Sequence, residues 1–319
     1  MNNMPNKELF VRYPKNPIIT AENLPYSANS VFNAGAVKIK DKYNLLMRIE
    51  DRRGISHLTL AHSKDGISDW QIDPQPTLIP KPDHYPEEIW GIEDPRITFL
   101  EEEKSWAITY TAYSGAGPLV SLILTKDFKK FNRLGPIMPP ENKDAALFPV
   151  KFNGRWGMIH RPVCNRPGVG AHIWLSFSPD LKHWGEHQIL IHSRSGSWWD
   201  ANKIGLCPPP LKTKDGWLLL YHGVKKTVSG DIYRLGLALL DLKDPRIVLA
   251  RSNEWVFSPK EKYEIFGDVD KVVFPCGWIQ ENEKILLYYG SADSCISLAT
   301  ANISELLEWL KEHNSQIKG

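Results

Sequence analysis

Asp94 is the carboxylate whose surroundings in the sequence best suit acid chemistry. It lies in the hexapeptide Gly91–Arg96, Gly-Ile-Glu-Asp-Pro-Arg, just ahead of the apolar run 97–100. Proline at 95 biases the residue before it toward extended geometry, so the motif predicts a carboxylate with a restrained backbone where a strand begins. Taken alone, the motif is better explained by a structural ion pair between Asp94 and Arg96 that closes a loop. Its position within a larger repeat changes that balance.

Polar side chains recur at two equivalent places in five repeated units, the start of a first strand and the end of a second strand. Both places lie at one edge of a meander, so in a radial arrangement their side chains converge at one mouth of the axial channel. Such convergence is typical of a ligand site. The set is Asn33, Asp94, Lys143, Asp144, Asn202, Lys203 and Asp268 from first strands, and Arg48, Asp51, Tyr113, His160, Arg161, His222 and Asp293 from second strands.

Four basic members of this set come from consecutive units: Lys143, Arg161, Lys203 and His222. Their mutual repulsion would destabilise the mouth unless an anion lay among them. Phosphate suits such a site, because lysines supply point charges and arginine a forked contact. The alternative is that each cation pairs with a nearby acid, such as Asp144 or Asp200.

Aromatic residues also fall near this edge of the units, namely Trp90, Tyr113, Trp198 and Trp199. They could stack against a sugar ring, or they could pack between the units. Packing is the better explanation for Trp198.

The units that position these residues share one order of apolar runs. The middle runs, each ending in a polar group, are 43–51, 106–113, 156–162, 217–223 and 285–290. Each has an apolar run on either side, and in three units an aspartate turn then leads to an aromatic residue, Trp70, Phe131 or Trp184, that opens a fourth strand. One four-stranded meander cannot bury both faces, whereas radial repetition can. We therefore predict an all-β fold, a five-bladed β-propeller, as one domain over residues 1–319.

The two ends of the chain and one repeated tripeptide lie outside this pattern. Residues 303–313 are apolar at helical spacing and predict a short C-terminal helix. We expect the segment 10–19 to supply the outer strand of the last blade and close the ring. Asp244-Pro245-Arg246 repeats the central tripeptide but follows a third strand, so we interpret Asp244 as part of a turn.

Composition and charge limit the possible partners. The net charge is +2, and 24 prolines, 22 glycines and 12 tryptophans suit many short strands joined by turns. A near-neutral chain argues against a nucleic-acid or membrane surface. The four cysteines, Cys164, Cys207, Cys276 and Cys295, have no metal-ligand spacing. We expect free thiols, no metal and, without a signal-peptide pattern at the start, a cytoplasmic protein. Self-association is left open.

These motifs resemble glycoside hydrolase family 130, the β-mannoside phosphorylases and related β-mannosidases, over about residues 12–293. The resemblance rests on seven segments: Asn33-Ala34-Gly35, Gly91–Arg96, Asn142-Lys143-Asp144 with Leu147-Phe148-Pro149, His160-Arg161-Pro162, Trp198-Trp199-Asp200 with Lys203-Ile204-Gly205, Tyr221-His222-Gly223 and Val273-Phe274-Pro275-Cys276. The family fold is a five-bladed propeller, in agreement with the repeat.

The resemblance implies phosphorolysis with inversion, in which a β-mannoside and inorganic phosphate give α-mannose 1-phosphate, with no cofactor besides the phosphate co-substrate. Asp94 matches the family's catalytic acid, which acts through the mannose 3-hydroxyl. The four basic residues match positions that hold phosphate. Asn33, Arg48, Asp51 and Asp268 match positions where the family binds mannose. We add Glu93, Tyr113 and Asp144 as candidate substrate-binding residues.

The cations favour a phosphorylase over a hydrolase, because phosphate needs no base whereas water needs a second carboxylate. Two departures from the β-1,4-specific pattern, Glu93 in place of tyrosine and Lys143 in place of arginine, point to β-1,2-mannosides. Two alternatives stay open. One is an inverting β-mannosidase with Glu93 or Asp144 as the base, and the other is a sugar-binding propeller without catalysis.

Overall fold

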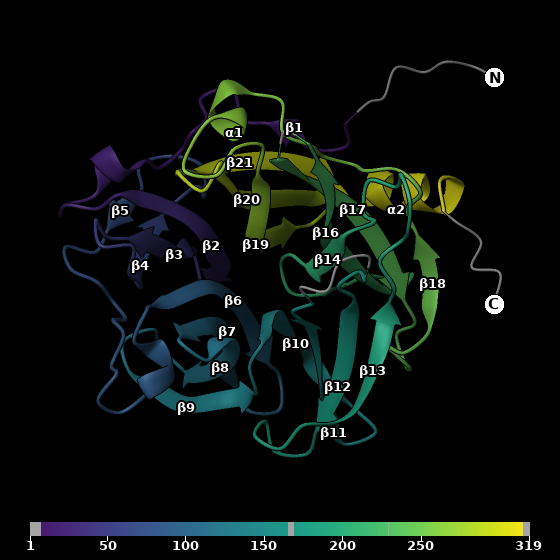
Figure 1. Cartoon of the computed structure of the whole chain (residues 1–319), viewed down its shortest axis with the longest axis horizontal. Coiled ribbons are helices and arrows are strands. Elements are labelled where there is room, and N and C mark those ends of the chain that lie inside the picture. The colour runs from purple at the N-terminus through teal and green to yellow at the C-terminus, as the bar shows by residue number, and fades with distance from the viewer. Residues whose placement is uncertain (1–7, 165–168, 229, 315–319) are drawn as a thin grey trace.

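The computed structural model describes residues 8–164, 169–228 and 230–314, and in it five antiparallel sheets form a ring (Figure 1). This arrangement confirms the predicted all-β, five-bladed propeller. The first blade contains β2 (Ser30–Ile39), β3 (Lys42–Glu50), β4 (Ser56–Ser63) and β5 (Gln71–Ile72), and the second contains β6 (Ile92–Leu100), β7 (Ser105–Ser114), β8 (Gly117–Thr125) and β9 (Phe131–Met138). The third contains β10 (Asn142–Phe152), β11 (Arg155–Pro162), β12 (Ile173–Ser178) and β13 (Gly185–Ile191).

The fourth and fifth blades complete the ring. The fourth contains β14 (Lys203–Leu206), β15 (Leu211–Lys212), β16 (Trp217–Thr227), β17 (Gly230–Leu240) and β18 (Val248–Arg251), and the fifth contains β19 (Val273–Glu281), β20 (Lys284–Ser291), β21 (Cys295–Asn302) and β1 (Val11–Arg12). Short helical turns lie at η1 (Ala21–Asn23), η2 (Pro86–Glu88) and α1 (Lys262–Ile265). The pairing of β1 with β21 confirms that the N-terminal segment supplies the last outer strand.

The C-terminal helix α2 (Ile303–Glu312) matches the predicted range to within one residue. The side chain of Asn302 caps its first turn by accepting a hydrogen bond from the backbone N–H of Glu305 at 3.2 Å. Leu306 and Leu310 on its buried face pack into the cluster between the fourth and fifth blades. The helix is therefore part of the core and not an appendage.

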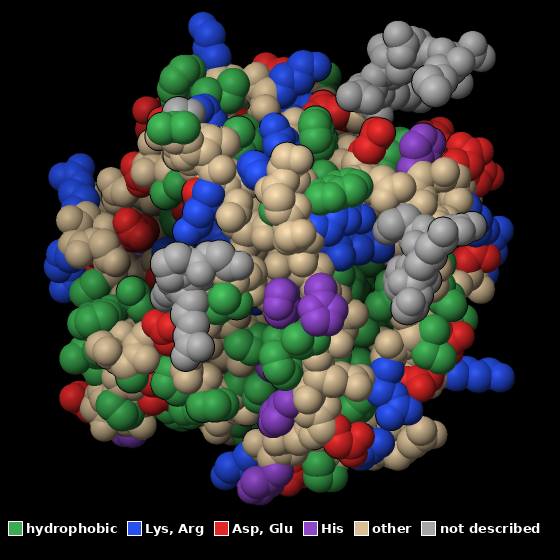
Figure 2. Space-filling model, turned by 45° about the vertical axis from the view of Figure 1, so that its right-hand side comes forward, with side chains coloured by type: hydrophobic (Ala, Val, Ile, Leu, Met, Phe, Trp, Pro, Cys, Tyr) green, Lys and Arg blue, Asp and Glu red, His purple; other side chains and the backbone are tan. Residues whose placement is uncertain are grey.

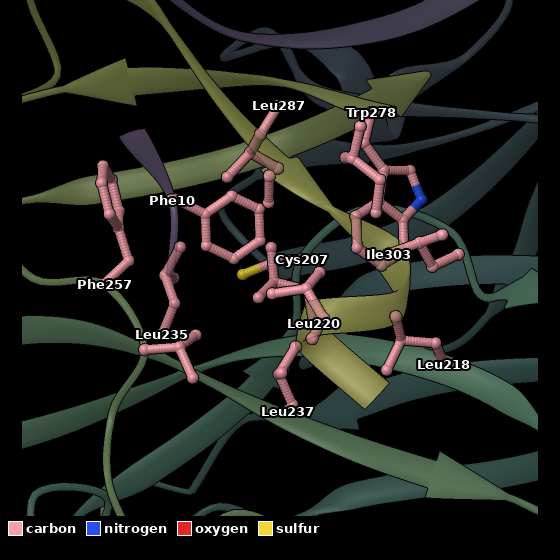
Figure 3. Packing of buried hydrophobic residues seen from close by; sticks show 14 of the residues in the cluster. Phe10, Cys207, Leu218, Leu220, Leu235, Leu237, Phe257, Trp278, Leu287 and Ile303 are labelled. Atoms are coloured by element: carbon pink, nitrogen blue, oxygen red, sulfur yellow. The ribbon is translucent and has the colours of Figure 1, made fainter. Parts of the chain in front are cut away.

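Apolar side chains of neighbouring blades meet face to face and form that core. Figure 3 shows one such cluster, to which Leu218 and Leu220 of β16 and Leu287 of β20 all belong. Phe10, from the segment that closes the ring, is buried in the same cluster. Burial between blades thus holds each sheet at a fixed angle to the next.

The first strands approach one another closely around the axis. At Gly277 of β19, an added Cβ would lie 2.3 Å from the backbone nitrogen of Ala36 on β2, so only glycine fits there. At Gly35 of β2 it would lie 2.6 Å from the backbone oxygen of Pro95 on β6. Side chains at the starts of these strands therefore reach a common opening.

The surface carries no obvious single-sign field on the face that Figure 2 shows, where acidic and basic side chains are interspersed. Among the described residues, no helix has the length and apolar character needed to cross a membrane.

Candidate active site

The same β-bulge recurs near the start of the first strand in three blades. The pairing register skips there, and one residue inside each skip has a left-handed backbone, with φ of 45° at Asn33, 50° at Asp94 and 53° at Asp144. A bulge re-aims the side chain of the extra residue, and asparagine and aspartate tolerate this conformation best. The prediction that Pro95 holds Asp94 extended is therefore wrong, because the bulge geometry overrides the local preference.

The carboxylate of Asp94 is buried and receives hydrogen bonds from two elements of the first blade. Its Oδ1 atom accepts from Nδ2 of Asn33 at 2.9 Å and from Nη1 of Arg48 at 3.1 Å. Its Oδ2 atom faces Nζ of Lys143, 3.9 Å away. Oδ2 is thus the oxygen with fewer hydrogen-bond donors around it, and it faces the third blade.

Charge around Asp94 decides its protonation in the free protein. Burial alone would raise the pKa of this carboxyl, but Arg48, Lys143 and Arg96 outweigh burial and hold the pKa below its usual value. Asp94 is therefore a carboxylate near neutral pH when no ligand is bound.

Arg96 does not form the loop-closing ion pair with Asp94 that its spacing suggested. Its Nη1 donates to the backbone oxygen of Asp94 at 3.2 Å, while Nε and Nη2 donate to the backbone oxygens of Cys207 and Leu206. Arg96 ties the second blade to the fourth near the axis, and the carboxylate of Asp94 stays available to the site.

Asp144 lies among the basic side chains and is completely buried. Its Oδ2 accepts from Nε of Arg161 at 2.6 Å, and Nη2 of Arg96 lies 3.5 Å from its Oδ1. Burial would raise its pKa, but the charges of Arg161, Lys143 and Arg96 hold the pKa far below the usual range. For Arg161, the alternative of pairing with a local acid is therefore correct, although the terminal guanidinium nitrogens donate no hydrogen bond to any described residue.

The two lysines differ in how well they are neutralised. Burial would lower the pKa of Lys143, but the carboxylates of Asp94 and Asp144 raise it overall. Burial and the neighbouring Arg161 lower the pKa of Lys203, whose nearest acid, Asp231, is 3.9 Å away. An added anion would thus stabilise the charged form of Lys203 more than that of Lys143.

His222 is not the fourth cation that the sequence suggested. Burial, the largest cause, lowers the pKa of its imidazole to about 3, although Asp144 favours the charged form. The ring is stacked with Tyr233 at 5.8 Å between centroids and lies 4.8 Å from Phe274. Desolvation by these aromatic rings keeps it neutral, so His222 offers the site a hydrogen bond but no charge.

Several of these groups line one pocket of about 360 Å³ between the second, third, fourth and fifth blades, and Asp94 lies behind its wall, next to Lys143. Its walls carry nine polar or aromatic groups of interest: Glu93, Tyr113, Lys143, Asp144, Arg161, Lys203, His222, Tyr233 and Phe274. Tyr113 is 38 % exposed at the rim, edge-on to Trp90. The convergence predicted from the repeat is therefore present for these members.

Glu93 and Arg48 form a second ion pair beside the acid. Nη2 of Arg48 lies 3.1 Å from Oε1 of Glu93, while Nη1 of the same side chain binds Asp94. Arg48 thus fixes the two consecutive carboxylates relative to each other.

Two predicted members lie away from the centre. Asp51 closes its own loop, because its carboxylate accepts from the backbone and guanidinium of Arg53 and from the backbone of Ile55. Asp268 is exposed and accepts from Nδ2 of Asn29 at 2.7 Å. Neither side chain lines the pocket, and their contact with a sugar stays a prediction.

Other members of the repeat set have structural partners. His160 is buried between Asn142 and Ser176, and Asp200 pairs with Arg194 and Arg251 instead of the pocket cations. Asp244 binds Arg246 in the turn before β18, as interpreted from the sequence.

Sequence reasoning missed Tyr233 and gave no role to Asp293. Tyr233 lines the pocket from a third strand, a position that the repeat rule leaves out, and Nζ of Lys203 lies 4.9 Å from its ring centre. Asp293 was in the repeat set without a role. Burial is the first cause that raises its pKa to about 6, with Asp94 and Glu93 adding to it and Arg48 and Lys143 opposing it. Asp293 has a left-handed backbone, with φ of 49°, and this conformation cannot be read from the sequence.

The part of the chain that the structure describes contains no set of side chains suited to bind a metal ion. No group of three or more His, Cys, Asp or Glu side chains there could hold a metal ion. All four cysteines are free thiols.

Comparison with known proteins gives consistent matches over nearly the whole chain. A family model described as β-1,4-mannooligosaccharide phosphorylase matches residues 3–312. A β-1,4-mannooligosaccharide phosphorylase from Ruminococcus albus is 35 % identical over 317 residues, 97 % of this chain and 93 % of the relative. A β-1,2-mannobiose phosphorylase from Listeria innocua is 38 % identical over 257 residues, 81 % of this chain and 69 % of the relative.

A solved structure extends the match to the fold. The β-1,2-mannobiose phosphorylase from Listeria innocua in complex with β-1,2-mannobiose has a TM-score of 0.86 at 30 % identity, over 95 % of this chain and 99 % of that one. Both the family model and these relatives agree with the motifs and the blades described above. This chain belongs to glycoside hydrolase family 130.

Proposed function

We propose that this protein is an inverting β-mannoside phosphorylase that uses inorganic phosphate as its co-substrate. The observation that carries the proposal is that Lys143, Arg161 and Lys203 line one pocket, and that Nζ of Lys143 lies 3.9 Å from Oδ2 of the buried acid Asp94. A cationic wall is what an anionic nucleophile needs, because positioning and charge neutralisation replace a general base.

The proposed step uses one acid and one nucleophile. A phosphate oxygen bonds to the anomeric carbon of mannose on the face opposite the leaving oxygen, and the glycosidic C–O bond breaks. The departing oxygen takes a proton that originates on Asp94 and passes through the mannose 3-hydroxyl. The products are α-mannose 1-phosphate and a shortened acceptor, and Asp94 is left as a carboxylate.

The proton belongs on Oδ2 of Asp94, since Oδ1 already accepts from Asn33 and Arg48. In the free protein the positive neighbours keep this carboxyl ionised. A bound phosphate would neutralise the field of Lys143, which faces Oδ2, and so raise the pKa of Asp94. Phosphate would thus prepare the acid as well as attack the sugar.

The remaining roles follow from position. Arg161, Lys203 and the neutral imidazole of His222 would hold phosphate, with Tyr233 beside them. Asn33, Arg48, Glu93, Tyr113 and Asp144 lie where they could contact or orient the mannoside, with Asp51 and Asp268 farther out. Asp144 is buried and bound to Arg161, and this arrangement disfavours it as the base of a hydrolase.

The finer proposal is a β-1,2-linked substrate. It rests on Glu93, whose carboxylate lines the pocket and is held by Arg48, and on Lys143 at the acid. A carboxylate here offers hydrogen bonds to sugar hydroxyls, whereas a tyrosine offers a flat ring. We also propose that the protein is cytoplasmic and that it needs no cofactor besides the phosphate co-substrate.

One experiment tests both levels. The protein is incubated with β-1,2- and β-1,4-mannobiose, with and without phosphate, and mannose 1-phosphate is measured. The proposal expects phosphate-dependent mannose 1-phosphate, faster from the β-1,2 disaccharide. Full activity without phosphate would indicate a mannosidase, and binding without product would indicate a sugar-binding propeller.

A further inference from the structure

A second hollow lies on the fourth blade, on the other side of the β16–β17 hairpin from the catalytic pocket. It encloses about 310 Å³, and its walls include Trp198, Trp199, Lys225, Arg234, Glu254 and Trp255. We call it the tryptophan groove.

The hairpin is a wall shared by the two cavities. Val224 pairs with Tyr233, and Gly223 pairs with Arg234, the next residue along β17. Because side chains alternate between the faces of a sheet, Tyr233 turns to the catalytic pocket and Arg234 turns to the groove. Only the thickness of one hairpin separates them.

Two tryptophan rings in the groove are each supported by a cation and remain partly open. Trp198 is 44 % exposed, with the guanidinium of Arg194 4.5 Å from its ring centre. Trp255 is 37 % exposed, with the guanidinium of Arg234 at 4.3 Å. Arg234 donates no hydrogen bond to any residue that the structure describes, so its donors are unused at the groove.

The groove is held rigid by the residue next to Trp198. Trp199 is buried, stacks on Tyr221 with 5.6 Å between centroids, and donates from Nε1 to the backbone oxygen of Asn253 at 3.0 Å. Gly223 and Gly236 make room for it, since an added Cβ at either would lie 2.5 Å from an indole carbon. A pre-formed aromatic surface loses little entropy on binding.

We propose that the tryptophan groove is a non-catalytic saccharide site that binds a pyranose unit of an oligosaccharide longer than the disaccharide. Open aromatic faces suit the C–H face of a pyranose, and Arg234 and Lys225 suit its hydroxyls. The volume of about 310 Å³ is at the lower end of the range for small-ligand sites. The choice of a mannose oligosaccharide rests on the proposed function.

The test measures binding of β-1,2-mannotetraose and β-1,2-mannobiose by calorimetry, with Asp94→Asn as the background so that no substrate is consumed. Adding Trp198→Ala or Trp255→Ala is expected to weaken tetraose binding about tenfold and to leave mannobiose binding unchanged. Phe99→Ala is the matched control, because Phe99 is 39 % exposed at the far end of β6 from Asp94. Thermal unfolding confirms that each variant is folded.

Unchanged tetraose binding in both tryptophan variants overturns the inference, and so does an equal loss for tetraose and mannobiose. Sedimentation is measured in parallel. If the Asp94→Asn protein forms an oligomer and adding Trp198→Ala dissociates it, the groove is an interface between copies and the inference fails. If the wild type releases no product from any mannoside, the proposed function fails, but the calorimetric comparison still decides the groove.

Discussion

Arg161 donates from Nε to Oδ2 of Asp144 across 2.6 Å, and both side chains are buried at the wall of the pocket. The pair leaves Arg161 oriented, with its terminal nitrogens available to phosphate. Arg161→Ala is therefore expected to lower kcat/KM for phosphate by about 10²- to 10³-fold, while any hydrolysis changes little. Initial rates over a range of phosphate concentrations measure this.

The matched control for that change is Arg246→Ala. Arg246 forms the same kind of pair with Asp244, Nε to Oδ1 at 2.7 Å, in an exposed turn away from the pocket. It should leave phosphate kinetics unaltered. Equal losses of phosphorolysis and hydrolysis in Arg161→Ala would show that Arg161 does something other than hold phosphate.

Asp94→Asn removes the proposed acid and keeps the shape of the side chain. An asparagine oxygen can still accept from Asn33 and Arg48, so the bulge is expected to persist. We expect kcat to fall about 10²- to 10⁴-fold, with mannobiose still bound. Asp244→Asn, in the repeated tripeptide, is the control and should retain full activity. Near-normal turnover by Asp94→Asn would assign the acid to another residue.

The fold could be predicted from the sequence because the repeat carries it. Each unit repeats three apolar runs, and the spacing of Trp217–Gly223 or Ile285–Gly290 leaves few other ways to bury both faces of a sheet. The outer strand expected within residues 10–19 is β1 (Val11–Arg12), which pairs with β21 and closes the ring. Side chains at equivalent strand ends, such as Asp94 and Lys143, were therefore expected at the same end of the axial channel.

What the sequence could not supply is the local geometry and the degree of burial. The left-handed backbone of Asp94 comes from a bulge set by the pairing of two strands. The neutral state of His222 comes from rings on β17 and β19 that are distant in the chain. Tyr233 lies in register with Val224 of β16 and, through it, with Lys203 of β14, so it reaches the pocket from a third strand that no repeat position marks.

Asp293 is expected to make stability depend on pH. Its pKa is 3.8 ordinarily and about 6 in the folded protein, so the folded state holds the proton over that interval. Stability from this group is fully present below pH 3.8 and is lost as the pH rises through 6. The unfolding free energy of Asp293→Asn, relative to that of the wild type, should therefore rise by on the order of 2 kcal/mol between pH 4 and pH 7. Urea unfolding at several pH values measures the difference.

Asp268→Asn is the control for the substitution itself, because Asp268 is exposed and does not line the pocket. It should change the unfolding free energy by about 0.5 kcal/mol or less. If Asp293→Asn differs from the wild type by the same amount at every pH from 4 to 8, Asp293 is ionised throughout, and neither its burial nor its acidic neighbours raise its pKa.

Arg12 anchors the strand that closes the ring. It donates from Nε and Nη2 to the two oxygens of Glu264 at 2.8 and 2.9 Å, and Glu264 is completely buried. Arg12→Ala would leave that carboxylate without its cation, so we expect a loss of about 3 kcal/mol in unfolding free energy, read from urea denaturation. Lys311→Ala is the control, since Lys311 pairs with Asp215 at the surface and is 57 % exposed, and it should cost less than about 1 kcal/mol. Equal small losses in the two variants would mean that β1 is held by Phe10 and its apolar neighbours, and that the buried ion pair adds nothing to closure.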